Sequence, residues 1–549
     1  MLEHRRVLLI GLDGATWRLL EPLMAKGWMP NLARLRAQGA WGVLESTLPP
    51  VTAAAWTTFQ TGVLPGKHGI LDFSQYVPGQ YRTKLVNSAD IPLPTIWQLA
   101  SKAGRRVVSV NVPLTYPLRK VDGVAVGGME TPSLRSRFIY PDDLKDRFLR
   151  ANPDYQILVP QTDFNLHGLD RFLKQCTAVE QTRVSAFLHL VHEVVPDWGL
   201  AMVHVQSTDH VQHAVYCWLD PSDTRFSPEH YAHIARFYQA VDDEVGRLVA
   251  DLGDERTLVV ILSDHGHGSV YNTVNMNAYL LQAGLLQTRG RGRATSPSLW
   301  LKSAMKWLLR LDRWNLNKAL LPPRIRRPLW ERLVQGYTLD WEYTTAYMIN
   351  GWVNAHIYLN LAGREPQGIV ARADYQQVRE QVAQALANLT DPARGVPIAQ
   401  RILRREEVFA GPYLGDAPDL LVVPTPGYEF TASLFQDSDA VVRPNRLGRD
   451  HMGAHTPDGI VLMAGPSVSN RRLSQAHLVD LFPTVLAWLD LPIPGYSDGH
   501  VLQDAFVAPL RVLADQMADS SQPPSPGRQE YSTEEQRTME ERLKALGYM

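Results

Sequence analysis

The stretch RVLLIGLDG at residues 6–14 decides the fold class, because a short apolar run that stops at Asp13-Gly14 predicts a buried strand ending in a turn. Two later stretches repeat the arrangement: VHVQSTDH at 203–210 and VILSDHG at 260–266. These two stretches overlap the runs 198–206 and 257–266, and helical patterns lie between the strands, the first of them at residues 16–38. Continuous apolar strands that alternate with helices predict an α/β fold, with a mostly parallel sheet covered by helices on both faces.

Composition and charge exclude several classes of protein. The chain has 549 residues, of which 45% are hydrophobic and 20% charged, so it can bury a sizeable core. Its net charge of -1 argues against a globally basic nucleic-acid-binding protein, and we expect no nucleic-acid partner. Two cysteines, Cys176 and Cys217, exclude a disulfide framework and agree with a reducing compartment. Because we interpret the N-terminus as a core strand and not a signal peptide, we expect a cytoplasmic protein.

The composition changes along the chain in a way that predicts four parts. We expect a catalytic core over residues 1–285 and 440–510, a basic, tryptophan-rich cap inserted at 286–335, and a smaller α/β subdomain at 336–439. Residues 511–549 read as a linker rich in Ser and Pro, followed by an exposed terminal helix.

Three of the predicted strands end in an aspartate. Ligands of open parallel sheets bind at the carboxyl ends of the strands, and three carboxylates gathered there would repel one another unless a cation neutralised them. Imidazoles accompany them, with His265 beside Asp264 and His213 four residues after Asp209. The candidate metal ligands are Asp13, Asp209, His213, Asp264, His265 and His455. Six such donors suit two open sites of about three protein ligands each, for borderline metals such as zinc. The alternative for each aspartate alone is a turn residue or helix cap.

The segment TLPPVTAAAW at 47–56 contains a candidate nucleophile. Its prolines end one element, and the alanine run predicts a helix that begins at Thr52. A hydroxyl at a helix N-terminus lies against backbone N–H groups and the positive end of the helix dipole, where a phosphoryl group can be held. The alternative is an ordinary threonine N-cap.

Five motifs in a fixed order resemble a known family. They are LLIGLDG at 8–14, T-x8-TG-x-x-P-x-x-HGI at 52–70, STDHVQH at 207–213, LSDHG at 262–266 and GAHTPDG at 453–459. Together they resemble the alkaline phosphatase superfamily, most closely its type I phosphodiesterase and nucleotide pyrophosphatase branch. The motifs span most of the chain.

The resemblance implies a metal-dependent hydrolase that cleaves phosphodiester or phosphoanhydride bonds of a small phosphoryl-containing substrate. Thr52 matches the nucleophile, which would form a phospho-enzyme intermediate. The ligands of the metal that activates it correspond to Asp13, Asp264 and His265, and those of the second metal to Asp209, His213 and His455. The resemblance therefore implies two divalent ions, with zinc expected and manganese as the alternative.

At two positions this chain differs from relatives in the superfamily, and both differences bear on the substrate. Sulfatases of the superfamily need Cys or Ser in C/S-x-P-x-R, whereas this chain has Thr52 followed by three alanines, which disfavours a sulfatase. Nucleotide pyrophosphatases follow HGI with an Asn that contacts phosphate, whereas here HGILDF places Phe73 there. This puts nucleotide specificity in doubt more than phosphoryl chemistry. A phosphomonoesterase or phosphonate hydrolase on the same site remains an alternative.

Residues 299–318 predict a basic amphipathic helix, with Trp300, Trp307 and Trp314 seven residues apart and Lys and Arg roughly opposite. We favour a cap helix whose tryptophans are buried. The alternatives are a helix on an anionic membrane, in a peripheral protein that acts on lipid-linked phosphoryl groups, and a basic face that attracts a polyanionic substrate.

Three further histidines flank the motifs. His204 lies inside a predicted strand, which favours a structural role. His210 and His267 are candidates for substrate contact, and we assign neither as a metal ligand.

Overall fold

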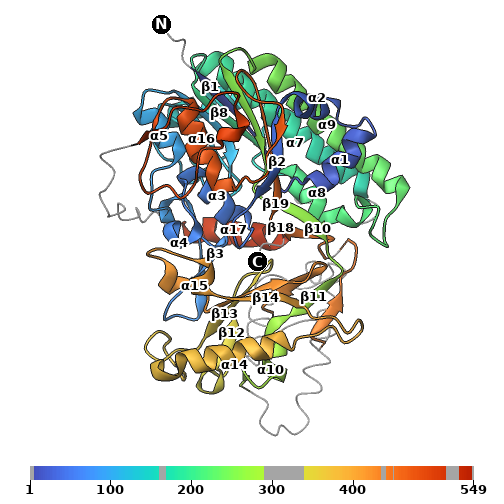
Figure 1. The fold of residues 1–549 in the computed structure, drawn as a ribbon, viewed down its shortest axis with the longest axis vertical. Coiled ribbons are helices and arrows are strands. Elements are labelled where there is room, and N and C mark those ends of the chain that lie inside the picture. The colour runs from blue at the N-terminus through green and yellow to red at the C-terminus, as the bar shows by residue number, and fades with distance from the viewer. Residues whose placement is uncertain are drawn as a thin grey trace.

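The chain forms two units, the larger built around one large sheet and the smaller around two small ones (Figure 1). The computed structural model describes residues 5–159, 168–289, 339–433, 440–448, 450–514 and 531–546. The predicted helix at 299–318, nearly all of the predicted cap and most of the predicted linker lie outside these residues. No helix within the described ranges has the length and apolar character needed to cross a membrane.

The larger unit is organised by a nine-stranded sheet whose centre is parallel. In spatial order the strands are β20 (Arg471–Arg472), β2 (Ala40–Glu45), β19 (Asp458–Ala464), β9 (Thr257–Leu262), β1 (Arg6–Leu12), β8 (Leu200–Val205), β5 (Val107–Val112), β6 (Gly123–Gly127) and β7 (Ile139–Tyr140). The five strands from β9 to β6 run parallel, whereas β19 and β7 pair antiparallel with their neighbours. The predicted α/β fold with a mostly parallel sheet is therefore confirmed.

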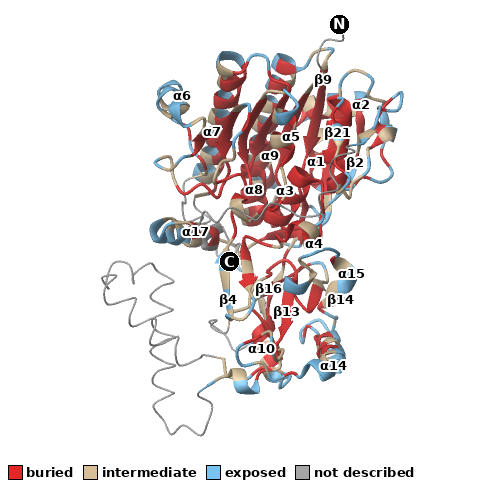
Figure 2. Cartoon of the chain, turned by 90° about the vertical axis from the view of Figure 1, so that its left-hand side faces the viewer, coloured by how far each residue is buried: buried red, intermediate tan, exposed pale blue. Residues whose placement is uncertain are grey.

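Helices cover both faces of this sheet because its strands are apolar on both sides. In β1, Leu8 and Ile10 enter one apolar cluster while Val7 and Leu9 enter the other, as the alternation of side chains along a strand requires. The first face is covered by α1 (Trp17–Ala25), α2 (Pro30–Gln38), α7 (Leu169–His189) and α9 (Pro228–Leu252), and the second by α3 (Thr52–Thr61), α5 (Ile96–Lys102) and α16 (Leu481–Trp488). Figure 2 shows the strands buried between these layers.

The smaller unit has a four-stranded antiparallel sheet beside a three-stranded one. The first contains β12 (Ala346–Met348), β13 (Ala355–Leu359), β15 (Leu420–Pro424) and β14 (Ala399–Arg404), and the second β16 (Tyr428–Thr431), β11 (Asn272–Asn275) and β17 (Val442–Pro444). Two helices, α10 (Met276–Gln282) and α14 (Tyr375–Ala387), and the hairpin of β3 (Ser74–Val77) and β4 (Arg82–Leu85) complete it. Other short helices and strands of the whole chain are α4 (Pro65–His68), α6 (Lys145–Ala151), α15 (Arg405–Val408), β21 (Pro492–Ile493) and β22 (Leu513–Ala514).

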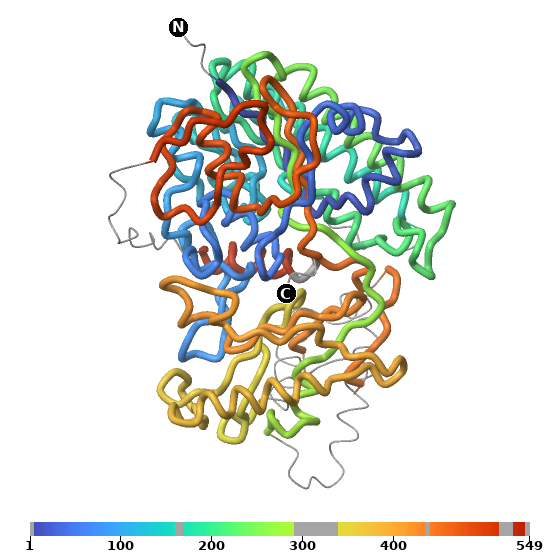
Figure 3. Tube along the Cα trace, viewed as in Figure 1, coloured from blue at the N-terminus to red at the C-terminus, as the bar shows by residue number. Residues whose placement is uncertain are grey.

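The packing places the start of the smaller unit earlier than the expected boundary after residue 285. Val274 and Met276 are fully buried in the apolar cluster of this unit. Tyr76, from the β3–β4 hairpin, lies in the same cluster. The chain therefore enters the smaller unit twice before residue 336, once as the β3–β4 hairpin and once as β11 followed directly by α10. The tube in Figure 3 lets the reader follow these crossings between the units.

The C-terminal helix α17 (Thr533–Leu546) is docked, which corrects the expectation of an exposed helix. Met539 and Leu543 are 1% and 2% exposed, and Leu543 joins an apolar cluster that includes Met129. The Arg542 guanidinium donates hydrogen bonds of 2.6 to 2.8 Å to three carbonyl oxygens of the loop after β6. The composition of this segment did not predict its docking, because only one stripe of the helix is apolar.

Leu543→Ala is expected to lower the free energy of unfolding by about 2 to 5 kcal/mol, because it removes a buried side chain and leaves a cavity. Urea unfolding followed by circular dichroism measures this change. The exposed residue Glu541, on the same helix, provides the control, and Glu541→Ala is expected to stay within about 0.5 kcal/mol of the parent. Equal effects of the two substitutions would contradict the docked position.

Candidate functional site

The three predicted strand-end carboxylates meet at one edge of the large sheet. Asp13 follows β1, Asp264 lies two residues after β9, and Asp209 lies in α8 (Ser207–Val215), which follows β8. These three strands are neighbours in the sheet, in the order β9-β1-β8. All three carboxylates are at most 1% exposed. Parallel pairing of adjacent strands therefore gathers the acidic groups that the sequence separates by up to 251 residues.

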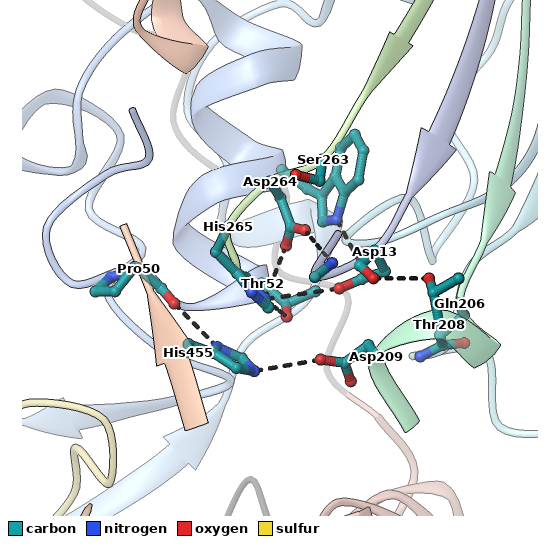
Figure 4. A network of polar contacts seen from close by, with 12 residues as sticks. Asp13, Pro50, Thr52, Gln206, Thr208, Asp209, Ser263, Asp264, His265 and His455 are labelled. Carbon is teal, nitrogen blue, oxygen red and sulfur yellow. Dashed lines mark hydrogen bonds and ion pairs between the residues drawn. The ribbon is translucent and has the colours of Figure 1, made fainter. Parts of the chain in front are cut away.

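A first cluster consists of Asp13, Asp264 and His265 (Figure 4). The His265 Nε2 atom lies 3.3 Å from Asp264 Oδ2 and 3.6 Å from Asp13 Oδ1. The hydroxyl of Thr52, the first residue of α3, lies 3.1 Å from the same Nε2 atom. The predicted nucleophile and three predicted ligands are thus in contact with one another.

Two buried rings orient Asp13. The Trp56 indole N–H donates to Asp13 Oδ2 at 3.3 Å, and His204 Nε2 lies 2.8 Å from the same oxygen. The Asp13 Oδ1 atom has no hydrogen-bond partner among the described residues and faces His265 instead. His204 and Trp56 therefore both contact the Oδ2 atom of Asp13 and leave its Oδ1 atom facing His265. The sequence did not single out Trp56.

A second cluster contains Asp209, His213 and His455, together with His267. The Asp209 Oδ1 atom lies 3.2 Å from His213 Nε2, 3.4 Å from His455 Nε2 and 3.3 Å from His267 Nε2. His267 belongs to β10 (Gly266–Ser269), which pairs antiparallel with β18 (Gly453–Thr456) and sets His267 opposite His455. Sequence reasoning left His267 as a candidate for substrate contact. Its position two residues after His265 was the available signal, since residues two apart in an extended segment point to the same side.

The two clusters adjoin each other. The imidazole rings of His265 and His455 stack with their centroids 3.5 Å apart. The two clusters therefore form a single centre, and Thr52 contacts the first cluster through His265. All seven residues predicted from the sequence are brought together here, whereas His210 is 9% exposed and its Nε2 atom has no hydrogen-bond partner within the described part of the chain.

The pKa values of the three carboxyl groups of the centre are shifted in opposite directions. Burial, followed by the charge of Asp209, raises the pKa of Asp13 well above its ordinary value. Burial, followed by the charges of Asp13 and Asp209, does the same to the pKa of Asp264. Burial also acts to raise the pKa of Asp209, but the surrounding imidazoles outweigh it and hold that pKa well below its ordinary value. Two buried carboxyls therefore lack a compensating positive charge in the protein itself.

The donor set fits divalent metal ions. Burial lowers the pKa of His265 and His267 well below the ordinary value and that of His455 to about 4, so the imidazoles are neutral, as metal ligands must be. The Asp264 Oδ2 atom, like Asp13 Oδ1, is buried without a hydrogen-bond partner among the described residues. A dication would satisfy these oxygens and supply the missing positive charge.

The loop after the HGI motif carries a carboxyl with a strongly shifted pKa. Burial raises the pKa of Asp72 from 3.8 to about 7, although the Phe73 backbone N–H donates to it at 2.7 Å. Phe73 is 1% exposed and belongs to the same apolar cluster as Val51 and Ala53, the residues on either side of Thr52. The position that holds Asn in nucleotide pyrophosphatases is thus part of an apolar cluster here.

Asp72→Asn is expected to stabilise the protein more at pH 8 than at pH 5. The folded carboxyl binds its proton up to about pH 7 and the unfolded one only to about pH 3.8, so stability falls as pH rises between these values. The benefit of the substitution should grow by about 3 kcal/mol between pH 5 and pH 8. Urea unfolding at both pH values measures it. Asp143→Asn, at an exposed site, is the control, and an Asp72→Asn benefit that does not change with pH would refute the raised pKa.

The fold and the centre together define a class: α/β hydrolases of the alkaline phosphatase superfamily, with buried Asp/His clusters able to hold metal. The model of the type I phosphodiesterase / nucleotide pyrophosphatase family matches residues 7–458. The chain belongs to this family, and the predicted resemblance and enzyme class are confirmed. A search of curated proteins found no match.

Two solved structures share the fold. Phosphonoacetate hydrolase from Sinorhizobium meliloti 1021, in complex with phosphonoacetate, is 17% identical with a TM-score of 0.55, over 88% of this chain and 96% of that one. Human ectonucleotide pyrophosphatase / phosphodiesterase 5 is 14% identical with a TM-score of 0.51, over 92% of this chain and 100% of that one. At these identities the likeness concerns the fold.

Proposed function

We propose that this protein hydrolyses small phosphodiesters or phosphoanhydrides through a phospho-enzyme intermediate on Thr52, at a site that binds two divalent ions. One observation carries the proposal: the Thr52 hydroxyl, at the start of α3, lies 3.1 Å from His265 in the first cluster, and the second cluster adjoins it. Family membership supports phosphoryl hydrolysis in general. The substrate is a small phosphoryl compound, and no nucleic acid is involved.

The residues of the chain divide the work in this proposal. Thr52 Oγ attacks phosphorus, the bond from phosphorus to the leaving oxygen breaks, and water later cleaves the phosphothreonine ester to release phosphate or its monoester. The N-terminal N–H groups of α3 donate towards the phosphoryl oxygens, since the first turn of a helix leaves them without intrahelical partners. Trp56 and His204 keep Asp13 oriented through its Oδ2 atom.

Two metal ions would be held by the two clusters, the first by Asp13, Asp264 and His265. When bound, such ions lower the pKa of a nucleophilic hydroxyl and stabilise negative charge on the attacking and leaving oxygens. Zinc is the metal that best suits these Asp and His donors, with manganese as the alternative.

Comparing three substrates tests the reaction class. The purified protein, loaded with zinc or manganese, is assayed with bis-p-nitrophenyl phosphate, p-nitrophenyl phosphate and phosphonoacetate. A kcat/KM for the diester at least about tenfold above the other two supports the diesterase, because 1.4 kcal/mol of differential transition-state binding gives a factor of ten. Faster turnover of the monoester or the phosphonate would replace it by the corresponding alternative on the same site.

The apolar environment of Phe73 argues that the site does not select nucleotides. Position 73 carries no polar side chain, and Phe73 is buried in the apolar cluster that also contains Val51 and Ala53. We therefore expect kcat/KM for a nucleotide diester to stay within about tenfold of that for a simple aryl diester. A strong nucleotide preference would mean that other residues contact the phosphate or the base.

A further inference from the structure

We propose that His267 is a fourth protein ligand of the metal ion at the second cluster, beside Asp209, His213 and His455. The proposal rests on the two-metal site of the proposed function and adds to it. The sequence motifs imply three ligands for this ion, and His267 is not one of them.

The local structure turns His267 towards the cluster. It lies on β10, two residues after His265, which immediately precedes this strand. Antiparallel pairing with β18 places His267 directly opposite His455, and their ring centroids are 5.0 Å apart. The ring of His267 also lies 4.7 Å from that of His213. His267 is fully buried within this group of rings.

Hydrogen bonding selects the tautomer that metal ligands require. Each of the three imidazoles sets its Nδ1 atom against a backbone carbonyl: 3.1 Å from His267 to Gly14, 2.9 Å from His213 to Gly453 and 2.9 Å from His455 to Pro50. Because a carbonyl only accepts, Nδ1 carries the proton and Nε2 presents a lone pair. Three lone pairs then converge on one carboxylate oxygen of Asp209. A metal ion between these atoms would accept the three lone pairs and the carboxylate together.

The distances from Asp209 to the three imidazoles suit one tetrahedral ion, and the Nε2 atoms of His213 and His455 lie 3.0 Å apart. Zinc–nitrogen bonds of about 2.0 to 2.1 Å place two tetrahedral ligand atoms about 3.3 to 3.4 Å apart. The His267 Nε2 atom lies 3.3 Å from Asp209 Oδ1, within the 3.2 to 3.4 Å that His213 and His455 show to the same oxygen. By distance, His267 cannot be told apart from the two assigned histidines.

The imidazole of His267 lies so close to Gly14 that a side chain at residue 14 would collide with it. Gly14 follows Asp13 with a φ of 67°, and a Cβ atom there would lie 2.5 Å from His267 Cε1. No side chain can therefore share this position with the imidazole. The same Gly14 supplies the carbonyl that holds Nδ1, so the turn after β1 both admits and orients the ring.

Four ligands predict an unequal pair of metal sites. The second cluster would bind its ion through one carboxylate and three imidazoles in the resting protein, and a substrate oxygen would enter as a fifth donor. The first cluster offers three side chains. The ion at the second cluster should therefore be released more slowly than the ion at the first.

Metal release from His267→Gln tests the proposal. The full-length protein and the variant are loaded with zinc, and transfer to a chromophoric chelator is followed over time. The parent is expected to release two ions per chain in a fast and a slow phase, and the variant to lose its slow phase, with release about 100-fold faster or more. His356→Gln removes another buried imidazole, in the smaller unit, and should release zinc like the parent.

The outcomes separate the two proposals. Two ions in the parent and an unchanged slow phase in His267→Gln would overturn the fourth ligand while leaving the proposed function intact. A parent that takes up no zinc or manganese would overturn both.

Cobalt(II) in the parent gives a readout that does not depend on the folding of a variant. One equivalent fills the tighter site, and four protein donors leave no bound water to ionise. The visible spectrum is therefore expected to stay constant from pH 6 to pH 9. A spectral change with a midpoint near pH 7 would indicate a bound water in place of His267, because a zinc-type site lowers the pKa of its water to about 7, and would overturn the proposal.

Discussion

Thr52→Ala is expected to lower kcat for bis-p-nitrophenyl phosphate by about 10⁴-fold or more, because it removes the only atom that can accept the phosphoryl group in the proposed first step. The Thr52 hydroxyl is fully buried and contacts His265 at 3.1 Å. Removing it leaves the candidate metal ligands in place, so metal content should stay unchanged. Steady-state kinetics and elemental analysis of the same preparation measure both quantities.

Two variants of the same helix control this prediction. Thr57 is equally buried in α3, but its hydroxyl donates only to the Ala53 carbonyl at 2.7 Å. Thr57→Ala should therefore cost stability with little change in kcat. Thr52→Ser keeps a hydroxyl and should retain most of the phosphoryl transfer. If Thr52→Ala kept a tenth or more of the parent kcat, another group would have to be the nucleophile.

Removal of the bound metal is expected to abolish hydrolysis and to destabilise the fold. Without cations, Asp13 and Asp264 must bind protons or remain as buried, mutually repelling charges. Each site contributes about 2.7 kcal/mol when the free metal exceeds its Kd by 100-fold. Dialysis against a chelator should therefore lower Tm and remove activity together, and zinc or manganese should restore both. A chelated enzyme that kept full activity would exclude a metal-dependent reaction.

Reloading with metal should become harder as pH falls. Burial and neighbouring charges raise the pKa of both Asp13 and Asp264, so these carboxyls keep protons to a higher pH than free aspartate does. Metal binding must displace these protons, and the apparent affinity should fall with decreasing pH. Titration of the chelated protein with zinc at pH 6, 7 and 8 measures this. Affinity that did not change over this range would contradict the raised pKa values.

Local patterns were sufficient to predict the central strands and the chemistry at their ends. The runs at 6–12, 198–206 and 257–266 correspond to β1, β8 and β9, because a strand buried on both faces must be apolar at every position. An aspartate at the end of each run predicted where a ligand would bind. The Thr52 helix also followed from local signals, since two prolines and an alanine run mark its start.

Local patterns were insufficient where a helix or loop docks on distant residues. Residues 16–38 gave one helical pattern but form two helices, α1 and α2, separated by Gly27 at a φ of 76°. The terminal helix was expected to be exposed, yet Leu543 is buried in an apolar cluster that also contains Met129. A single apolar stripe predicts that a face will be covered without showing what covers it.

The sequence by itself determined the strands, the strand-end carboxylates and the helix that begins at Thr52, because side-chain periodicity and turn chemistry act over a few residues. Only the tertiary structure decided that His267 faces Asp209 and that Phe73 joins an apolar cluster beside Thr52. Both depend on chain segments that approach from far along the sequence: β18 pairs with β10 across nearly 190 residues. Such contacts follow from sheet order and loop closure, which no short window of sequence contains.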